Sequence, residues 1–188
     1  MDAEVFNGLV EVSKNSHAAM CEQGFTTVPH LYVVDGSRLV ARVQVRPMHV
    51  GEDALTALGE MSTLVAAAEA DELLLVWETH DIATACDLAP FGVWPCLNIL
   101  TATATGHVLH RFPYTEARAG VLPDGRASVK PLWRTPLAPV PGAELFPPVR
   151  GVVDYAFVPF EGAAAGRMRA AGAYLESEGY TVNFFEPA

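Results

Sequence analysis

The chain has 188 residues, of which 51% are hydrophobic and 18% are charged, and its formal net charge is −10. This hydrophobic content excludes an intrinsically disordered chain, and the length allows a core to form without the help of a metal or a disulfide. The negative charge disfavours nucleic acid and anionic membrane surfaces as partners, whereas the excess of apolar over charged residues favours self-association or a protein partner.

Three cysteines, Cys21, Cys86 and Cys96, are far apart and form no CxxC pair. Their odd number and wide spacing predict free thiols rather than a disulfide framework or a structural zinc site. The N-terminal stretch lacks the basic and apolar regions of a signal peptide, and no apolar run reaches the ~20 residues that a membrane span requires. We therefore expect a cytoplasmic protein with no membrane partner, and the sequence indicates no cofactor and no metal site.

A helix and a β-hairpin are expected first. Apolar residues recur at helical spacing over residues 3–21, and Gly24 follows as a helix stop. Two Val-rich segments, 30–34 and 39–45, then flank the dipeptide Asp35-Gly36. An Asp-Gly pair between such segments is a strong signal for a hairpin turn.

The second hairpin strand carries the densest basic feature of the chain. It consists of three arginines at a spacing of four, Arg38, Arg42 and Arg46. On a regular strand these side chains share one face, which we interpret as a solvated outer face.

A second helix and a central strand follow the hairpin. The helix is expected over residues 51–70, with Glu52 and Asp53 in its first turn, where carboxylates favour the positive end of the helix dipole. Its predicted buried stripe consists of Leu55, Leu58, Met61 and Val65. The continuous apolar run at 73–77 predicts a strand that is covered on both faces.

Beyond residue 90 the pattern is that of β-strands. Three segments, 94–103, 107–114 and 128–135, are expected to form a meander, with a turn at Gly106 between the first two. The segment from Pro131 to Pro148 is then rich in proline. The spacing of these prolines predicts an extended surface connection over 136–149, without a helix or a central strand.

The last part of the chain shows a β-α-β order. We expect a strand at 152–158, a helix at 162–178 and a strand at 180–185. These elements, which we call the C-terminal arm (150–188), are too few to enclose a core. The arm must therefore dock on the preceding sheet or exchange onto that of a second copy.

These elements predict a single α+β domain over residues 1–188. Its main body would be 1–135, followed by the proline-rich connection 136–149 and the arm. The sheet is expected to be mostly antiparallel, with one helix before and one after the β-hairpin.

The end of the central strand offers the strongest candidate catalytic residues, which are Glu78, His80 and Asp81. Strand ends often carry the reactive groups of α/β proteins, and a carboxylate beside an imidazole can orient a general base or a metal ligand. On a continuing strand Glu78 and His80 would face the same side. The structural alternative is that a strand simply ends at the surface, with Asp81 capping a short helix.

Other motifs point to no familiar enzyme class. His107 and His110 are three residues apart on a predicted strand, so they would face opposite sides and could not bind one metal ion together. The sequence contains no GxSxG, P-loop or HExxH motif.

The leading hypothesis is therefore a non-enzymatic interaction or assembly protein that associates with itself or with another protein, of bacterial or phage origin as its many alanines suggest. One alternative is a small metal-assisted or acid–base hydrolase that uses Glu78 and His80. A second alternative is a small-ligand sensor with a pocket lined by Trp77, Trp94 and Trp133.

Overall fold

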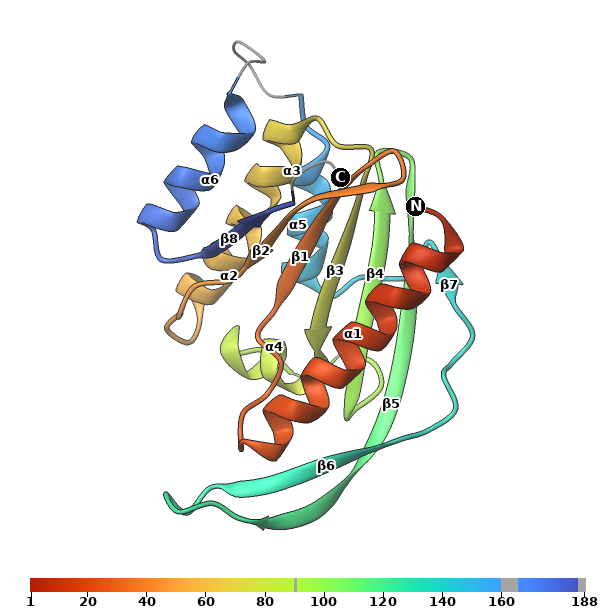
Figure 1. Cartoon of the computed structure of the whole chain (residues 1–188), viewed down its shortest axis with the longest axis vertical. Helices are drawn as coiled ribbons and strands as arrows, with labels where there is room; N and C mark the ends of the chain where they lie inside the picture. The colour runs from red at the N-terminus through yellow and green to blue at the C-terminus, as the bar shows by residue number, and fades with distance from the viewer. Residues whose placement is uncertain (90, 160–165, 186–188) are drawn as a thin grey trace.

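A computed structural model describes residues 1–89, 91–159 and 166–185 and shows an α+β fold (Figure 1). Its sheet has the strand order β6-β5-β4-β3-β1-β2-β8, and β7 pairs with β5. Every pairing between these strands is antiparallel. The strands are β1 (His30–Asp35), β2 (Arg38–Gln44), β3 (Glu72–Glu78), β4 (Cys96–Thr103), β5 (Gly106–Val121), β6 (Ala127–Trp133), β7 (Val140–Pro141) and β8 (Thr181–Phe184). The α+β class and the mostly antiparallel sheet are as predicted.

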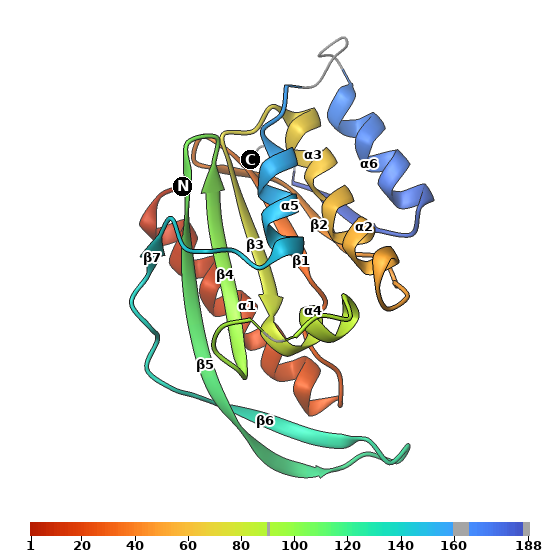
Figure 2. The same ribbon diagram turned by 180° about the vertical axis from the view of Figure 1, so that it is seen from behind.

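Helices cover both faces of the sheet. The helix α1 crosses one face (Figure 1), and α2, α3, α5 and α6 lie over the other (Figure 2). The helices are α1 (Ala3–Glu22), α2 (Glu52–Glu60), α3 (Ser62–Ala68), α4 (Thr79–Ala85), α5 (Pro147–Ala156) and α6 (Arg167–Ser177). Two hydrophobic cores result, a small one under α1 and a large one under the other helices.

The strand β3 separates the two cores, as its apolar run predicts. Leu73, Leu75 and Trp77 belong to the large core, whereas Leu74 and Val76 belong to the core under α1. Because successive side chains of a strand point to opposite faces, an uninterrupted apolar run is what a strand buried on both sides requires.

The predicted face of three arginines does not form. A register shift between Val33 and Val34 interrupts the β1–β2 pairing. As a result Val40 lies in the large core, while Arg42, two residues later, lies over the Tyr32 ring on the opposite face. A β-bulge of this kind reverses the alternation of side chains along a strand. Beyond the end of β2, Arg46 forms an ion pair with Asp53, at 2.6 Å between Nη2 and Oδ1.

The single helix predicted over 51–70 is divided into α2 and α3 at Met61. Of the predicted buried stripe, Leu58, Met61 and Val65 are buried, but Leu55 is exposed. The place of Leu55 in the core is taken by two alanines, Ala54 and Ala57, which allow α2 to lie close to the neighbouring α5.

The strand predicted at 152–158 is wrong, because residues from Pro147 to Ala156 form the helix α5. Pro147 and Pro148 occupy the first positions of this helix, where proline fits because no amide hydrogen is needed there. Val149, Val152 and Ala156 are buried at helical spacing. The proline-rich connection therefore contains the start of a helix, contrary to the prediction of an extended connection without one.

The last strand that the structure describes, β8, joins the same sheet. The strand β8 pairs with β2, and α6 packs against α3. Gly172 allows α6 to lie close to β8, because a Cβ atom at this position would lie 2.5 Å from Cζ of Phe184. The predicted helix 162–178 is observed as α6 from Arg167 to Ser177, and its predicted part at 162–165 lies outside the described residues.

Candidate functional site

The three residues predicted at the end of the central strand are adjacent but do not form one site. The strand ends at Glu78, and α4 begins at Thr79. Contrary to the prediction, Glu78 and His80 therefore do not share one face of a continuing strand. The carboxylate of Glu78 is buried and accepts hydrogen bonds from the backbone N–H groups of His80 at 2.6 Å, Asp81 at 3.0 Å and Cys96 at 3.1 Å. Glu78, rather than Asp81, is thus the cap of the short helix.

His80 and Asp81 instead line a cavity of about 610 Å³ beside α4, together with Gln44 and Arg46. Nε2 of His80 lies 3.5 Å from the Thr84 hydroxyl. The Asp81 atom Oδ2 is buried and has no hydrogen-bond partner among the described residues. Burial, reinforced by the nearby Glu78 charge, raises the pKa of Asp81 to about 6.

No metal-binding cluster is present in the described part of the chain, since no three His, Cys, Asp or Glu side chains gather there as ligands. The predicted separation of His107 and His110 is confirmed. Nε2 of His107 lies 2.9 Å from the carbonyl oxygen of Ala143, whereas His110 packs on the Phe6 ring of α1.

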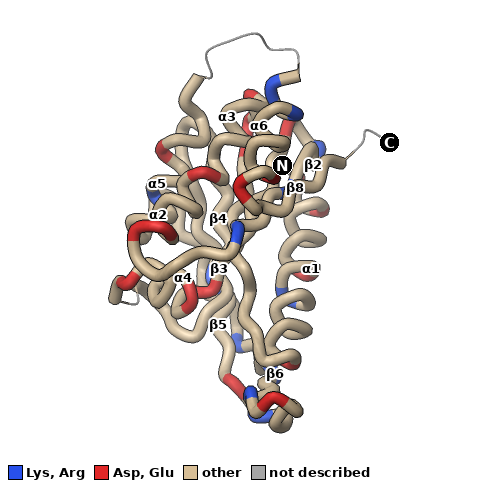
Figure 3. Tube along the Cα trace, turned by 90° about the vertical axis from the view of Figure 1, so that its left-hand side faces the viewer, with Lys and Arg blue, Asp and Glu red and all other residues tan. Residues whose placement is uncertain are grey.

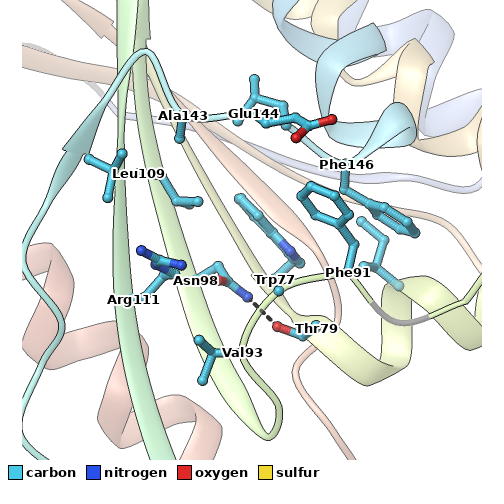
Figure 4. A pocket seen from close by; sticks show the side chains of 14 residues that line it. Trp77, Thr79, Phe91, Val93, Asn98, Leu109, Arg111, Ala143, Glu144 and Phe146 are labelled. Atoms are coloured by element: carbon cyan, nitrogen blue, oxygen red, sulfur yellow. Dashed lines mark hydrogen bonds between the residues drawn. The ribbon is translucent and has the colours of Figure 1, made fainter.

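A second cavity, which we call the Arg111 cavity, lies on the sheet face opposite α1 and has a volume of about 350 Å³ (Figure 4). Three neighbouring strands form its floor, because Trp77 of β3, Asn98 of β4 and Arg111 of β5 are directly opposite one another in register. Residues paired in this way project from the same face of a sheet, so all three side chains meet in the cavity. The cavity is lined by Trp77, Thr79, Ile82, Phe91, Gly92, Val93, Asn98, Leu109, Arg111, Val140, Ala143, Glu144, Leu145 and Phe146.

Asn98 is the buried polar centre of this floor. Its Nδ2 group donates to the Thr79 hydroxyl at 2.8 Å and to the Cys96 carbonyl at 3.1 Å. These two bonds fix the orientation of the amide and tie β4 to the first residue of α4. No hydrogen bond among the described residues uses its Oδ1 atom, which leaves this acceptor free for a bound molecule.

Arg111 is the one cation among the lining residues that the structure describes. Its side chain is partly buried, and its Nε atom has neither exposed surface nor a hydrogen-bond partner among the described residues. None of the ion pairs of the described chain involves Arg111, and the nearby carboxylate of Glu144 is exposed at the rim. An arginine in this position creates a local positive potential inside an acidic protein.

The other end of the Arg111 cavity is aromatic. Phe91 stacks on Phe146 with 6.0 Å between ring centroids and 17° between ring planes. In Figure 4 these two rings lie on one side of Trp77, and the Arg111 guanidinium lies on the other. The cavity therefore has a charged end and an apolar end, which is the usual composition of a small-molecule site.

The three tryptophans do not share one pocket. Only Trp77 lines the Arg111 cavity. Trp94 is exposed, with its ring 5.5 Å from that of His80, and Trp133 packs on Tyr114 and His17 beside α1. The predicted tryptophan-lined pocket is thus wrong in its composition, although one of its members lies in a cavity.

Asn98 and Arg111 belong to no motif that predicts a site from the sequence. Asn98 interrupts the otherwise apolar start of β4, and the hairpin turn at residues 104–105 places Arg111 opposite to it. A polar residue in a buried strand together with a cation at the partner position in the hairpin was the available signal.

Comparison of the chain with protein-family models, curated proteins and solved structures gives no match. Within the described residues, no helix combines the length and the apolar character that a membrane crossing requires.

Proposed function

We propose that this protein binds a small organic molecule in the Arg111 cavity and that it acts by binding rather than by catalysis. The observation that carries this proposal is the register of β3, β4 and β5, which aims an aromatic ring, an amide and a guanidinium into one cavity. Pockets for small molecules are mostly apolar with a few convergent polar groups, and their volumes begin at about 300 Å³. A cavity of about 350 Å³ suits a ligand of metabolite size.

The hydrolase alternative has less support from the geometry. It requires Glu78 and His80 to converge in one cavity, but Glu78 lines neither the Arg111 cavity nor the cavity beside His80. Both oxygens of its carboxylate accept backbone N–H groups. A carboxylate with these hydrogen bonds stabilises the backbone and is not available to a substrate.

A screen of small metabolites by thermal unfolding tests the proposed function. A ligand present at a hundred times its Kd stabilises the native state by about 2.7 kcal/mol, which raises the unfolding temperature measurably. The variant Val93→Trp places a large ring at the cavity wall and should abolish the shift, whereas Val121→Trp, on the exposed end of β5, should retain it. Ligands that stabilise the Val93→Trp variant as well as the wild type would contradict the proposal, and so would a screen without a ligand.

Self-association is a second candidate function, favoured by the long β5–β6 hairpin. Beyond Thr115 the strand β5 pairs only with β6, so both edges of this ribbon lack a partner strand within the described chain. Val121 and Leu132 are exposed on it, and its tip carries the ion pair between Asp124 and Arg126 (Figure 3). Free strand edges with apolar side chains are templates for pairing with a second copy.

Light scattering combined with size-exclusion chromatography tests this second candidate. We expect a dimer that dissociates when Val121 and Leu132 are both replaced by lysine, and that persists when the exposed Val12 of α1 is replaced instead. A monomer at all protein concentrations would contradict self-association through this hairpin.

A further inference from the structure

We infer that the ligand of the Arg111 cavity is a small carboxylate with an aromatic or similarly flat apolar body. This inference rests on the proposed function and adds the chemical class of the ligand. It is carried by three features of the cavity, which are the uncompensated charge of Arg111, the number of cations in the lining, and the position of the aromatic rings.

The first feature is the missing counter-charge of Arg111. Taking a charged donor out of water without a partner is costly, so buried cations are normally paired with an anion. Arg111 has no such partner among the described residues, and its Nε atom is already shielded from solvent. An anion that enters the cavity would supply the missing partner.

The backbone holds this guanidinium in place. Arg111 lies within β5, opposite Asn98 of β4, and its carbonyl oxygen accepts the backbone N–H of Leu137 on the other side. Its strand is thus bonded on both edges. A guanidinium presents its N–H donors in a planar fork that matches the two oxygens of a carboxylate.

The second feature, the charge of the lining, favours a carboxylate over a phosphate. Among the described residues that line the cavity Arg111 is the only cation, and Glu144 contributes a negative charge at the rim. A phosphate monoester carries about 1.5 to 2 negative charges near neutral pH, so one arginine beside a glutamate leaves it under-compensated. A monocarboxylate carries a single charge, which one guanidinium neutralises.

The third feature sets the body of the ligand. Trp77 lies between the charged end of the cavity and the stacked rings of Phe91 and Phe146 (Figure 4). Leu109 completes the apolar wall. Flat apolar groups gain free energy from burial against such rings and from offset or edge-to-face ring contacts. A carboxylate bound at Arg111 therefore places the body of the molecule against Trp77 and towards the two phenylalanines.

Isothermal titration calorimetry with a matched series of compounds tests this inference. The probes are benzoate, phenylacetate and 3-phenylpropionate, the neutral amides of these three acids, and phenyl phosphate. We expect at least one carboxylate to bind, and we expect its amide and phenyl phosphate to bind about tenfold or more weakly, because a charge-assisted pair is lost or mismatched.

Variants of Arg111 locate the recognition. Arg111→Gln should weaken carboxylate binding by about tenfold to a hundredfold and affect the amides much less, because only the carboxylate forms a charge-assisted bond with the guanidinium. Arg111→Lys keeps the charge but loses the fork, so its affinity should be intermediate. Arg118→Gln, an exposed position further along the same strand, should bind as the wild type does, and thermal unfolding checks that each variant is folded.

The possible failures are distinguishable. If an amide binds as tightly as its acid and Arg111→Gln changes nothing, the ligand class is wrong although the cavity still binds small molecules. Tighter binding of phenyl phosphate than of every carboxylate also overturns the class. If none of the compounds binds and the metabolite screen finds no ligand, the proposed function fails together with this inference.

Discussion

Arg111 is partly buried beside Trp77 and Asn98, and its Nε atom is shielded from solvent. It forms no ion pair in the described chain, so the hydration that it loses on folding is not replaced by an anion. Functional residues often have this property, since a site must leave groups unsatisfied for its ligand to satisfy. Removing the charge of Arg111 should therefore weaken ligand binding but stabilise the protein without ligand.

We expect Arg111→Met to stabilise the empty protein, because the methionine side chain fills the same space without a charge. Replacing buried charged groups by apolar side chains of similar size is neutral or stabilising, so the free energy of unfolding should stay the same or rise by about 1 kcal/mol. Urea unfolding of both proteins without ligand provides the measurement. A loss of stability of about 2 kcal/mol or more would show that Arg111 serves the fold instead.

At the scale of elements, the helix α4 connects the two cavities. Thr79 and Ile82 line the Arg111 cavity, whereas His80, Asp81 and Thr84 line the larger cavity on the other side of the helix. The position of α4 depends on Glu78, whose carboxylate binds the first turn of the helix and the start of β4 at the same time. This glutamate thus fixes one wall of each cavity.

We expect Glu78→Ala to lower the free energy of unfolding by about 3 kcal/mol, since three backbone N–H groups lose a charged acceptor. Glu78→Gln, which retains an acceptor oxygen, should cost less. The exposed Glu144→Ala provides the control and should change stability by less than about 0.5 kcal/mol. If Glu78→Ala unfolds at the same urea concentration as the wild type, the carboxylate is not a structural cap.

Much of the fold could be predicted from local pattern. The Asp35-Gly36 turn, the apolar run of β3 and the hairpin of β4 and β5 are all observed, because turn chemistry and alternation are encoded within a few residues. The turn of this second hairpin lies at residues 104–105, and Gly106, where the turn was expected, begins β5. The strand expected at 152–158 was the main failure. Its β-branched run also fits the buried stripe of a helix, and tertiary contacts with α2 and α3 decide in favour of α5.

The candidate site is harder to predict from the sequence than the fold. The sequence predicts Glu78, His80 and Asp81 at the end of one strand, but β3 ends at Glu78 and His80 and Asp81 lie in α4, whose abrupt start turns the side chains in different directions. The Arg111 cavity depends on three strands that align across the chain from residue 77 to residue 111. This alignment depends on how the three strands pair in the sheet, and no short sequence motif predicts it.

At the scale of the whole molecule, buried histidines make stability depend on pH. Burial lowers the pKa of His17 and of His30 to about 4, below the value near 6.5 of an unfolded histidine. Between these values the unfolded chain binds more protons than the native one, so stability falls as the pH falls from 6.5 towards 4. Asp81 acts in the opposite sense, because its pKa is raised to about 6. Burial also lowers the pKa of His110, which adds to the effect of the two buried histidines, so Asp81 is outnumbered.

We therefore expect a net loss of stability on acidification from pH 7 to pH 4.5, measured by urea unfolding across this range. The variant His17→Gln should show a shallower dependence on pH, whatever its absolute stability, because one of the two histidines no longer titrates. Asp81→Asn should show a steeper one, since it removes the opposing group. Stability that rises on acidification of the wild type would contradict these assignments.

The central claim is that the protein binds a small carboxylate in the Arg111 cavity, and the three tryptophans allow it to be tested directly. Trp77 lines this cavity, whereas Trp94 lies beside His80 and Trp133 beside α1, so their indole N–H signals in a ¹⁵N-labelled protein report on three separate places. Single tryptophan-to-phenylalanine variants assign the signals. On titration with the tightest-binding carboxylate we expect the Trp77 signal to shift and the other two to stay, and we expect a clearly smaller Trp77 shift in Arg111→Gln at the same concentration. A shift confined to Trp94 or Trp133, or a Trp77 shift that Arg111→Gln retains in full, would contradict the claim.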